Sequence, residues 1–176
     1  KFIRRHDIPK GNGHERPLGI PVIEDTRLQA ACARLLHAID AQEFLGCSYG
    51  YRPGRGAGDA VRDLTFDLQY GRYGYVVEAD IQGFFDHMDH DWLLKMLRLR
   101  IDDRAFLGLI RKWLKAGILE TDGRVIHPDT GTPQGGVVSP VLANVYVHYA
   151  LDLWCEKVVK PRGRGEALIS RYADDL

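Results

Sequence analysis

The sequence predicts an α+β fold, in which helices pack beside short strands. Residues 28–39 place apolar side chains at the i, i+3, i+4, i+7 spacing of an amphipathic helix. Residues 75–80 and 167–169 are short apolar runs that lead into aspartates, and such runs are typical of strands. Asp122-Gly123 lies between two further short apolar runs, which is the pattern of a β-hairpin.

The composition is that of an ordinary folded domain. The 176 residues are 45% apolar and 27% charged, and 24 basic residues balance 24 acidic ones, so net charge gives no sign of a nucleic-acid partner. Three widely spaced cysteines argue against a disulfide framework or a zinc site and favour a reducing compartment. No apolar run reaches the length of a membrane span, and no signal peptide is present. Because the sequence lacks a starting Met, we expect it to be a piece of a longer protein.

The strongest chemical signal is a set of three carboxylates at the ends of two apolar runs. Asp174 and Asp175 are consecutive, and a tight turn would let both converge, whereas adjacent side chains of one strand point to opposite faces. Asp80 ends the other run. If the two runs lie side by side, the three acids form an oxygen-rich site suited to Mg²⁺, and two such ions about 4 Å apart support phosphoryl transfer. Taken alone, an Asp-Asp pair is more typical of a solvated turn or a helix start.

Residues 1–23 predict a hairpin whose turn lies at residues 9–13. Lys10 and Arg16 stand near its tip. They are either two solvated surface cations or a clamp for a polyphosphate, since lysine supplies a point charge and arginine a bidentate fork.

Two helices are expected next. The first is capped by Asp25 or Thr26 and ends near Leu45. Its expected buried face is Leu28, Ala31, Cys32, Leu35, Leu36 and Ile39. The second covers about 57–70, with Val61, Leu64 and Leu68 facing inward.

A glycine-rich loop at residues 47–58 separates these helices. It interleaves aromatic residues with Arg52 and Arg55, a mixture that can stack bases and hold phosphates. A plain exposed loop explains the same residues equally well.

The stretch after Asp80 contains several residues whose role can be interpreted in two ways. Gly83 permits close backbone approach to a ligand, and Phe84 and Phe85 either wall a pocket or belong to the core. Residues 87–91 resemble a metal cluster, but we interpret Asp89 as the N-cap of a helix and expect the histidines to be partly exposed.

The second half of the chain predicts a helix at 103–116, a hairpin at 118–127 and a long helix from Ser139 to about Lys157. Ser139 is expected to cap that last helix, with Pro140 in its first position. The glycine-rich loop before it carries Gln134 and lacks the Gly-Lys-Ser/Thr of a Walker loop. The positive end of the helix dipole beside this loop favours a nucleotide or a template.

The order of these segments resembles the reverse transcriptases of bacterial group II introns, the intron-encoded maturases, and their relatives. Asp80-Ile81-Gln82-Gly83-Phe84-Phe85, the run from Gly131 to Pro140, and Tyr172-Ala173-Asp174-Asp175 are similar to motifs A, B and C of that family. Residues 8–21 and 50–55 also match it, so the resemblance covers essentially the whole chain.

The resemblance implies a right-hand polymerase with an antiparallel palm sheet packed against helices. Residues 1–75 are expected to form the fingers and 76–176 the palm, with about 100–131 as a stretch that could return to the fingers. The chain stops after motif C, so the thumb is expected to be absent and the isolated fragment weakly active or inactive.

The resemblance also implies the roles of the acids. Asp80 and Asp174 would hold two Mg²⁺ ions, for which Mn²⁺ could substitute. The carbonyl of Ile81 would assist them, and Asp175 would complete the set.

Contacts to substrates follow from the same resemblance. Lys10 and Arg16 would grip the triphosphate of the incoming deoxynucleotide, together with the backbone of Gly83 and Phe84. Phe85 would lie under the sugar and exclude a 2′-hydroxyl. The remaining implied contacts are Gln134 in the nucleotide pocket and Arg52 and Arg55 on the template.

The implied activity is RNA-directed DNA synthesis, with an RNA template, a DNA or RNA primer, a dNTP and, as a further partner, intron RNA. The implied location is the bacterial cytoplasm, with no membrane partner. Two other classes stay open: an RNA-binding module for splicing or defence with a non-functional polymerase site, and an unrelated two-metal nuclease or cyclase.

Overall fold

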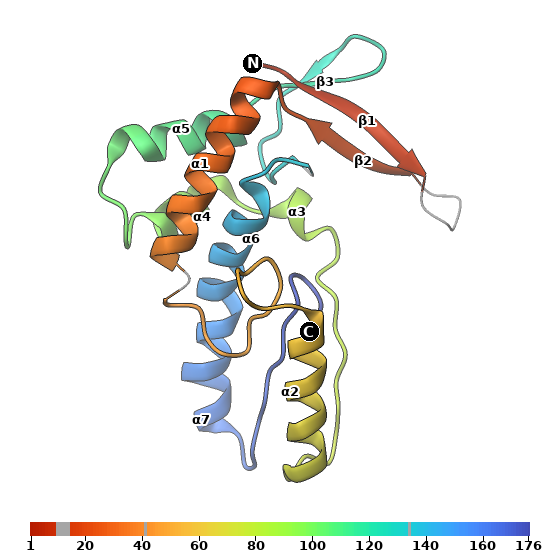
Figure 1. Cartoon of the computed structure of the whole chain (residues 1–176), viewed down its shortest axis with the longest axis vertical. Helices are drawn as coiled ribbons and strands as arrows, with labels where there is room; N and C mark the ends of the chain where they lie inside the picture. The colour runs from red at the N-terminus through yellow and green to blue at the C-terminus, as the bar shows by residue number, and fades with distance from the viewer. Residues whose placement is uncertain (10–14, 41, 134) are drawn as a thin grey trace.

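The computed structural model describes residues 1–9, 15–40, 42–133 and 135–176. Helices and short strands are mixed along the chain, which confirms the expected α+β class (Figure 1). The elements in order are β1 (Ile3–Pro9), β2 (Glu15–Ile20), α1 (Ile23–Asp40), α2 (Ala57–Tyr70), α3 (Phe84–His87), α4 (His90–Leu97), α5 (Arg104–Leu114), β3 (Ile118–Leu119), β4 (Val125–Ile126), α6 (Ser139–Val147), η1 (His148–Asp152), η2 (Cys155–Val159) and α7 (Lys160–Arg162).

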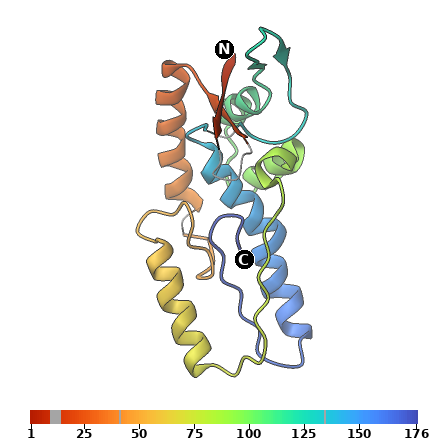
Figure 2. The same cartoon turned by 90° about the vertical axis from the view of Figure 1, so that its right-hand side faces the viewer.

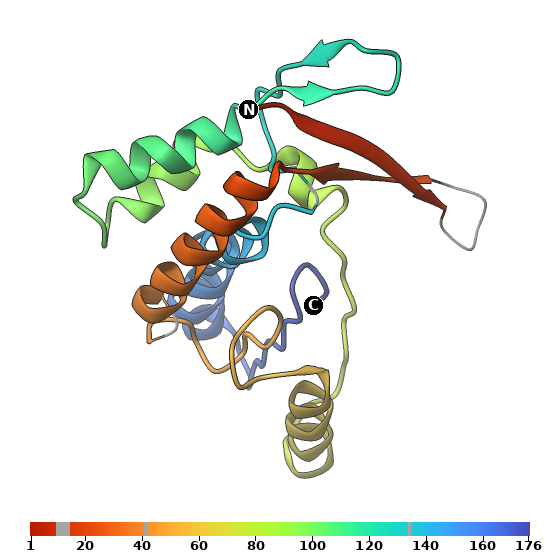
Figure 3. The same cartoon turned by 45° about the horizontal axis from the view of Figure 1, so that its top comes forward.

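Within the described residues, the named strands form one sheet in the order β2-β1-β3-β4. Both predicted hairpins are present: β1 pairs antiparallel with β2, and β3 with β4. The turn of the second hairpin uses Gly123 at φ 86°, a value that glycine tolerates without strain. The sequence did not predict that β3 would pair parallel with β1, which joins the two hairpins into one sheet that projects from the helices (Figure 3).

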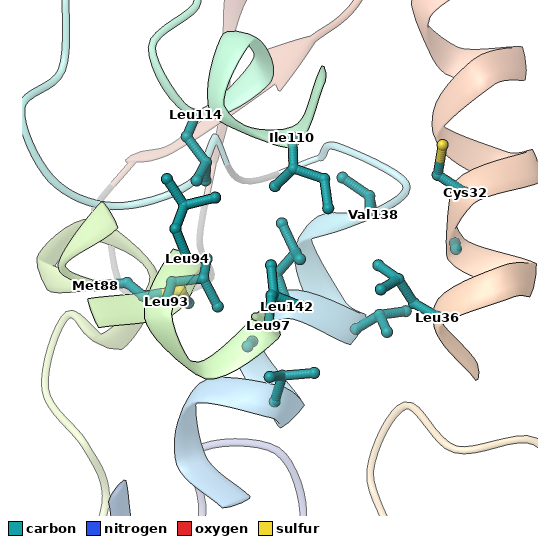
Figure 4. Close-up of a cluster of buried hydrophobic side chains, with 14 of the residues drawn as sticks. Cys32, Leu36, Met88, Leu93, Leu94, Leu97, Ile110, Leu114, Val138 and Leu142 are labelled. Atoms are coloured by element: carbon teal, nitrogen blue, oxygen red, sulfur yellow. The ribbon is translucent and has the colours of Figure 1, made fainter. Parts of the chain in front are cut away.

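The core lies where α1, α4, α5 and α6 meet (Figure 4). Leu36, Leu93, Ile110 and Leu142 are fully buried there. Each such side chain contributes about 1.5–3 kcal/mol through its removal from water, so this cluster is the main stabilising unit beneath the sheet.

Helix α1 differs from its prediction in extent and in its buried face. It begins at Ile23 and ends at Asp40, short of Leu45. Neither Asp25 nor Thr26 is its N-cap; the Thr26 hydroxyl instead donates back to the Val22 carbonyl (3.0 Å). A narrow stripe that includes Cys32 and Leu36 is buried, because among the named elements α1 packs mainly on α6. Leu28, Leu35 and Ile39 are exposed on the remaining surface.

Helix α2 has the predicted bounds but not the predicted burial. No residue of it is buried, and Val61 and Leu68 are 64% and 43% exposed. Figures 1 and 2 show the reason: α2 stands away from the helical core, and the chain after α7 passes between them.

The predicted N-cap of α4 is present, and α5 has an N-cap that was not predicted. Asp89 accepts a hydrogen bond from the amide of Trp92, and Asp103 accepts from two amides of the first turn of α5. The histidines of residues 87–91 differ from each other. His87 is exposed, whereas His90 is 4% exposed, against expectation, because its Nε2 pairs with the Gly131 carbonyl.

The long helix after the glycine-rich loop is α6 followed by two π-helical stretches, η1 and η2. Ser139 is the first residue of the helix and not its cap, so Pro140 is in the second position, one later than predicted. The Ser139 hydroxyl donates to the Pro133 carbonyl (3.1 Å) and pairs with the Thr132 hydroxyl (2.7 Å), so it holds the preceding loop instead.

Residues 75–79 are extended but do not form a strand. Tyr75 is 94% exposed and Val77 is 82% exposed. The reason is that, within residues 75–81, the described backbone hydrogen bonds to residues 174–176 come only from Ala79 and Ile81. In the described residues, no helix is long and apolar enough to cross a membrane.

Candidate active site

The two consecutive aspartates lie in a tight turn, as the sequence predicts. The amide of Tyr172 donates to the Asp175 carbonyl (2.9 Å), and the amide of Asp175 donates to the Tyr172 carbonyl (3.1 Å). We call residues 172–175 the acid turn. Ala173 adopts φ 61°, a left-handed conformation that costs a non-glycine residue about 1–2 kcal/mol, so the turn needs support from its surroundings.

The acid turn pairs with the segment that carries Asp80. The amide of Ile81 donates to the Asp174 carbonyl (3.2 Å), and Ala79 and Leu176 exchange two backbone hydrogen bonds (2.9 and 3.0 Å). Asp80 and Asp175 are antiparallel bridge partners. Backbone pairing therefore brings together the two acidic segments that are 94 residues apart in sequence.

All three carboxylates have access to solvent. Asp80 and Asp175 are exposed, and Asp174 is half-buried. Asp80 and Asp175 also line a groove of about 870 Å³, whose other wall is the exposed apolar face of α2 and residues 75–77. A substrate can therefore reach the acids without a change in the core.

The donor set at this site fits a hard cation held jointly with a substrate. Asp80 and Asp174 offer carboxylate oxygens from the two paired segments. Among the residues that the structure describes, no group of three or more His, Cys, Asp or Glu side chains forms a metal cage. Mg²⁺ does not require one, because it commonly takes one or two carboxylates and completes its shell with water and substrate phosphates.

Residues 81–85 follow Asp80 directly and lie beside the acids. Gly83 has φ 60° and precedes α3. Phe84 is buried in the core and stacks edge-on with Tyr146. Phe85 is half-buried and lies edge-on to Tyr51 with a centroid separation of 6.5 Å, so the two aromatic residues have different surroundings.

The glycine-rich loop before α6 packs against residues 85–88. The Thr132 amide donates to the Phe85 carbonyl and the Gly131 amide to the Met88 carbonyl, both at 2.7 Å. A Cβ on Gly135 would lie 2.7 Å from the Gly19 carbonyl, so this loop also touches β2 closely. The loop thus connects residues 85–88 to the first hairpin.

Some predicted site residues fall outside the described part of the chain. Lys10 and Gln134 are not described, and neither is the side chain of Arg16, although its backbone pairs with Ile8 in the first hairpin. Their predicted contacts with a nucleotide remain predictions.

Arg52 and Arg55 both bind carbonyls of their own loop. Arg52 donates to the carbonyls of Leu45 (3.0 Å) and Ser48 (2.8 Å), and burial lowers its pKa below the ordinary value. Arg55 donates to the Gly46 carbonyl (2.5 Å) and lies over the Tyr49 ring. Arg55 is exposed to solvent, and its predicted contact with a template stays a prediction.

The loop at residues 47–50 lies directly against the acid turn. The Tyr49 amide donates to the Arg171 carbonyl (2.9 Å), and the Arg171 amide donates to the Cys47 carbonyl (2.7 Å). A Cβ on Gly50 would lie 2.4 Å from the Ala173 nitrogen. The sequence predicted no contact between this loop and the acids, and the absence of a side chain at Gly50 was the only local signal of a close approach.

The sequence matches a family model described as reverse transcriptase (RNA-dependent DNA polymerase) over residues 8–176. The group II intron-encoded protein LtrA of Lactococcus lactis subsp. cremoris is 41% identical over 147 residues, which are 83% of this chain and 24% of that protein. Protein YkfC of Escherichia coli strain K12 is 38% identical over 201 residues, which cover 98% of this chain and 52% of that protein. The chain therefore spans about a quarter and about a half of the length of these two curated relatives.

Solved structures share the fold. Apo telomerase from Candida tropicalis, truncated from its C-terminal domain, superposes with a TM-score of 0.67 at 12% identity, over 99% of this chain and 42% of that one. Telomerase from Candida albicans, solved in complex with a fragment of telomeric RNA, gives a TM-score of 0.66 at 12% identity, over 99% and 37%. These two likenesses concern the fold; the family match over residues 8–176 shows that the chain belongs to the reverse transcriptase family.

Proposed function

We propose that this chain is the catalytic core of an RNA-directed DNA polymerase that transfers deoxynucleotides from dNTPs to a primer 3′-hydroxyl on an RNA template. The observation that carries the proposal is the backbone pairing of Asp80 with the acid turn, in a chain of the reverse transcriptase family. The primer hydroxyl attacks the α-phosphate, and pyrophosphate leaves.

The three acids have the central role in this proposal. Members of this family use divalent metal ions, and we propose Mg²⁺, with Mn²⁺ as a substitute, at Asp80 and Asp174, aided by the Ile81 carbonyl and by Asp175. When bound, such ions lower the pKa of the attacking hydroxyl and neutralise the leaving pyrophosphate. The exposure of Asp80 and Asp175 along the groove supports this assignment, because primer and dNTP phosphates must share the ligand shell.

We assign nucleotide contacts to the surrounding segments. Phe85 is the proposed sugar gate, and its position between Tyr51 and the loop before α6 supports this role. Gly83 and Phe84 contribute backbone contacts. The remaining proposed contacts are Lys10 and Arg16 at the triphosphate, Gln134 in the pocket, and Arg52 and Arg55 at the template.

Residues 1–75 are proposed as the fingers and 76–176 as the palm. The parallel pairing of β3 with β1 supports the return of about 100–131 to the fingers, because it ties that stretch to the first hairpin. The proposed partners are an RNA template, a DNA or RNA primer and a group II intron RNA; the last is supported by the name of one relative, a group II intron-encoded protein. The proposed location is the bacterial cytoplasm.

The test is primer extension on an RNA template with Mg²⁺, using the full-length parent protein and its Asp174→Ala variant. We expect DNA product from the parent and none from the variant. Asp91→Ala is the matched control, because Asp91 is an exposed acid of α4 outside the site, and it should retain full activity. If neither the parent nor the control makes product while both bind RNA, the polymerase proposal is wrong and the binding-module alternative stands.

A second measurement separates a polymerase from a two-metal nuclease or cyclase. Phe85→Val shortens the side chain proposed to exclude the 2′-hydroxyl, so incorporation of ribonucleotides by the full-length protein should rise relative to deoxynucleotides. If the variant still extends primers and its preference for deoxynucleotides is unchanged, Phe85 does not exclude the 2′-hydroxyl.

A further inference from the structure

One arginine next to the acid turn is completely enclosed. Arg171 has no exposed surface, and neither has Asp152, its partner at the end of η1. The Nε and Nη2 atoms of Arg171 donate to the two carboxylate oxygens of Asp152 at 2.9 and 2.8 Å, a bidentate pair. Removing two charges from water is costly, and such pairs are often no more stabilising than apolar residues of similar size, so stability alone does not account for this one.

The remaining donors of Arg171 reach three other segments. Nη1 donates to the Asn144 side-chain oxygen of α6 (3.1 Å) and to the Ala173 carbonyl (2.9 Å), and Nη2 donates to the Ser48 hydroxyl (2.7 Å). The guanidinium therefore binds a helix, a loop and the acid turn at the same time.

Asn144 extends the same connection. It is 1% exposed, and its amide nitrogen donates to the Gly50 carbonyl (2.8 Å), while its oxygen accepts from Arg171. Gly50 in turn lies against the Ala173 backbone, since a Cβ on it would come within 2.4 Å of the Ala173 nitrogen. The loop at 47–50 is therefore fixed to both α6 and the acid turn.

The bond to the Ala173 carbonyl is the informative one. Ala173 is the residue held in the left-handed region, and its carbonyl belongs to the peptide group that precedes Asp174. Strained conformations of this kind persist only where the surrounding structure determines them fully. The hydrogen bond from Arg171 holds the Ala173–Asp174 peptide in place, and the orientation of this peptide sets the direction of Asp174.

We propose that Arg171 is a positioning residue of the polymerase site: held rigid by Asp152, Asn144 and Ser48, it fixes the acid turn so that Asp174 and Asp175 stand in register with Asp80. This inference rests on the proposed function, since it gives the acids their catalytic meaning. The described structure assigns Arg171 no contact with the groove, so it acts through the turn and not on the substrate.

The experiment uses two variants of the full-length protein. Arg171→Lys keeps a positive charge beside Asp152 but loses the planar fork that reaches Asn144, Ser48 and Ala173. Ser48→Ala removes only the hydroxyl that accepts from Arg171. It is measured beside the first variant, so the proposal can still be tested if Arg171→Lys does not fold. Ile110→Val, which removes one methylene from the fully buried core away from the site, is the control for a loss of stability alone.

Three readouts are compared: amide hydrogen exchange of residues 171–176 without metal, Mn²⁺ affinity, and kcat with KM for dNTP. We expect faster exchange of the Tyr172 and Asp175 amides in both variants, and losses of about 10- to 100-fold in Mn²⁺ affinity and kcat with unchanged KM, the range typical of outer-shell partners of metal ligands. Ile110→Val should show none of these changes.

The outcomes separate this inference from the proposed function. If the parent extends primers and both variants lose activity only in proportion to their unfolded fraction, with exchange of the turn unchanged, the positioning role is wrong and the polymerase stands. If the parent extends no primer, but Asp174→Ala and Arg171→Lys both lose Mn²⁺ affinity, the polymerase proposal is wrong and the positioning role stands.

Discussion

Gly50→Ala is the substitution that most directly probes the contact between the loop and the acid turn. A Cβ at this position would lie 2.4 Å from the Ala173 nitrogen and 3.1 Å from both the Ala173 Cα and the Tyr172 carbonyl carbon. All three atoms are backbone, so no side chain can rotate away to make room. Either the loop or the turn must move.

The size of the movement follows from the distances. Ordinary contact begins at 3.4 Å, so the 2.4 Å approach must open by about 1 Å. Overpacking of this kind costs about 1–3 kcal/mol of stability. A misplacement of about 1 Å at reacting groups costs about 100-fold in rate, so we expect kcat to fall by that order while the protein stays folded.

The assay is steady-state primer extension by the full-length variant, beside thermal unfolding. Gly46→Ala is the matched control from the same loop, because a Cβ there meets nothing within 4 Å. The control should keep wild-type kcat. A Gly50→Ala protein with wild-type kcat and stability would show that the loop does not press on the acid turn, and would refute the reasoning.

Two further predictions concern buried titratable groups. Burial, opposed by Arg100, raises the pKa of Asp40 from 3.8 to about 6, and its Oδ2 has no hydrogen-bond partner among the residues that the structure describes. The stability that this raised pKa contributes is present below pH about 4 and is lost as pH rises through 6. Asp40→Asn should therefore gain up to about 3 kcal/mol between pH 4 and pH 8 relative to the wild type, measured by urea unfolding, and a pH-independent difference would contradict this origin. Burial, then the Asp152 charge, raises the pKa of Cys47 to about 11, so its alkylation at pH 8 should be about 100-fold slower than that of an unperturbed thiol, and equal rates would be incompatible with the described burial.

Features determined by neighbouring residues could be predicted from the sequence. The cap at Asp89 and the turn at Asp122-Gly123 depend on a few adjacent side chains and backbone angles, and both were found where expected. The tight turn at Asp174-Asp175 belongs to the same class. Local rules suffice for such elements because their hydrogen bonds close within a few residues.

Features determined by distant partners could not be predicted. Helical periodicity indicates that α1 and α2 each have an apolar face, but it cannot tell whether another element covers it, and for Val61 none in the described chain does. His90 was expected to be partly exposed because the sequence does not reveal its partner, Gly131, which is 41 residues away. Arg171 resembles any charged residue before a turn until Asp152 and Ser48 are placed around it.

The span of the Ser48–Arg171 contact has a consequence for synthesis of the protein. The two residues are 123 positions apart, so the loop that joins them closes only after nearly all of this chain has left the ribosome. Contacts between distant residues also slow folding, because chain entropy must be lost before they form. The helical core can therefore begin to assemble before the acid turn is fixed, and a nascent chain holds no organised acids until Ser48 and Arg171 have met.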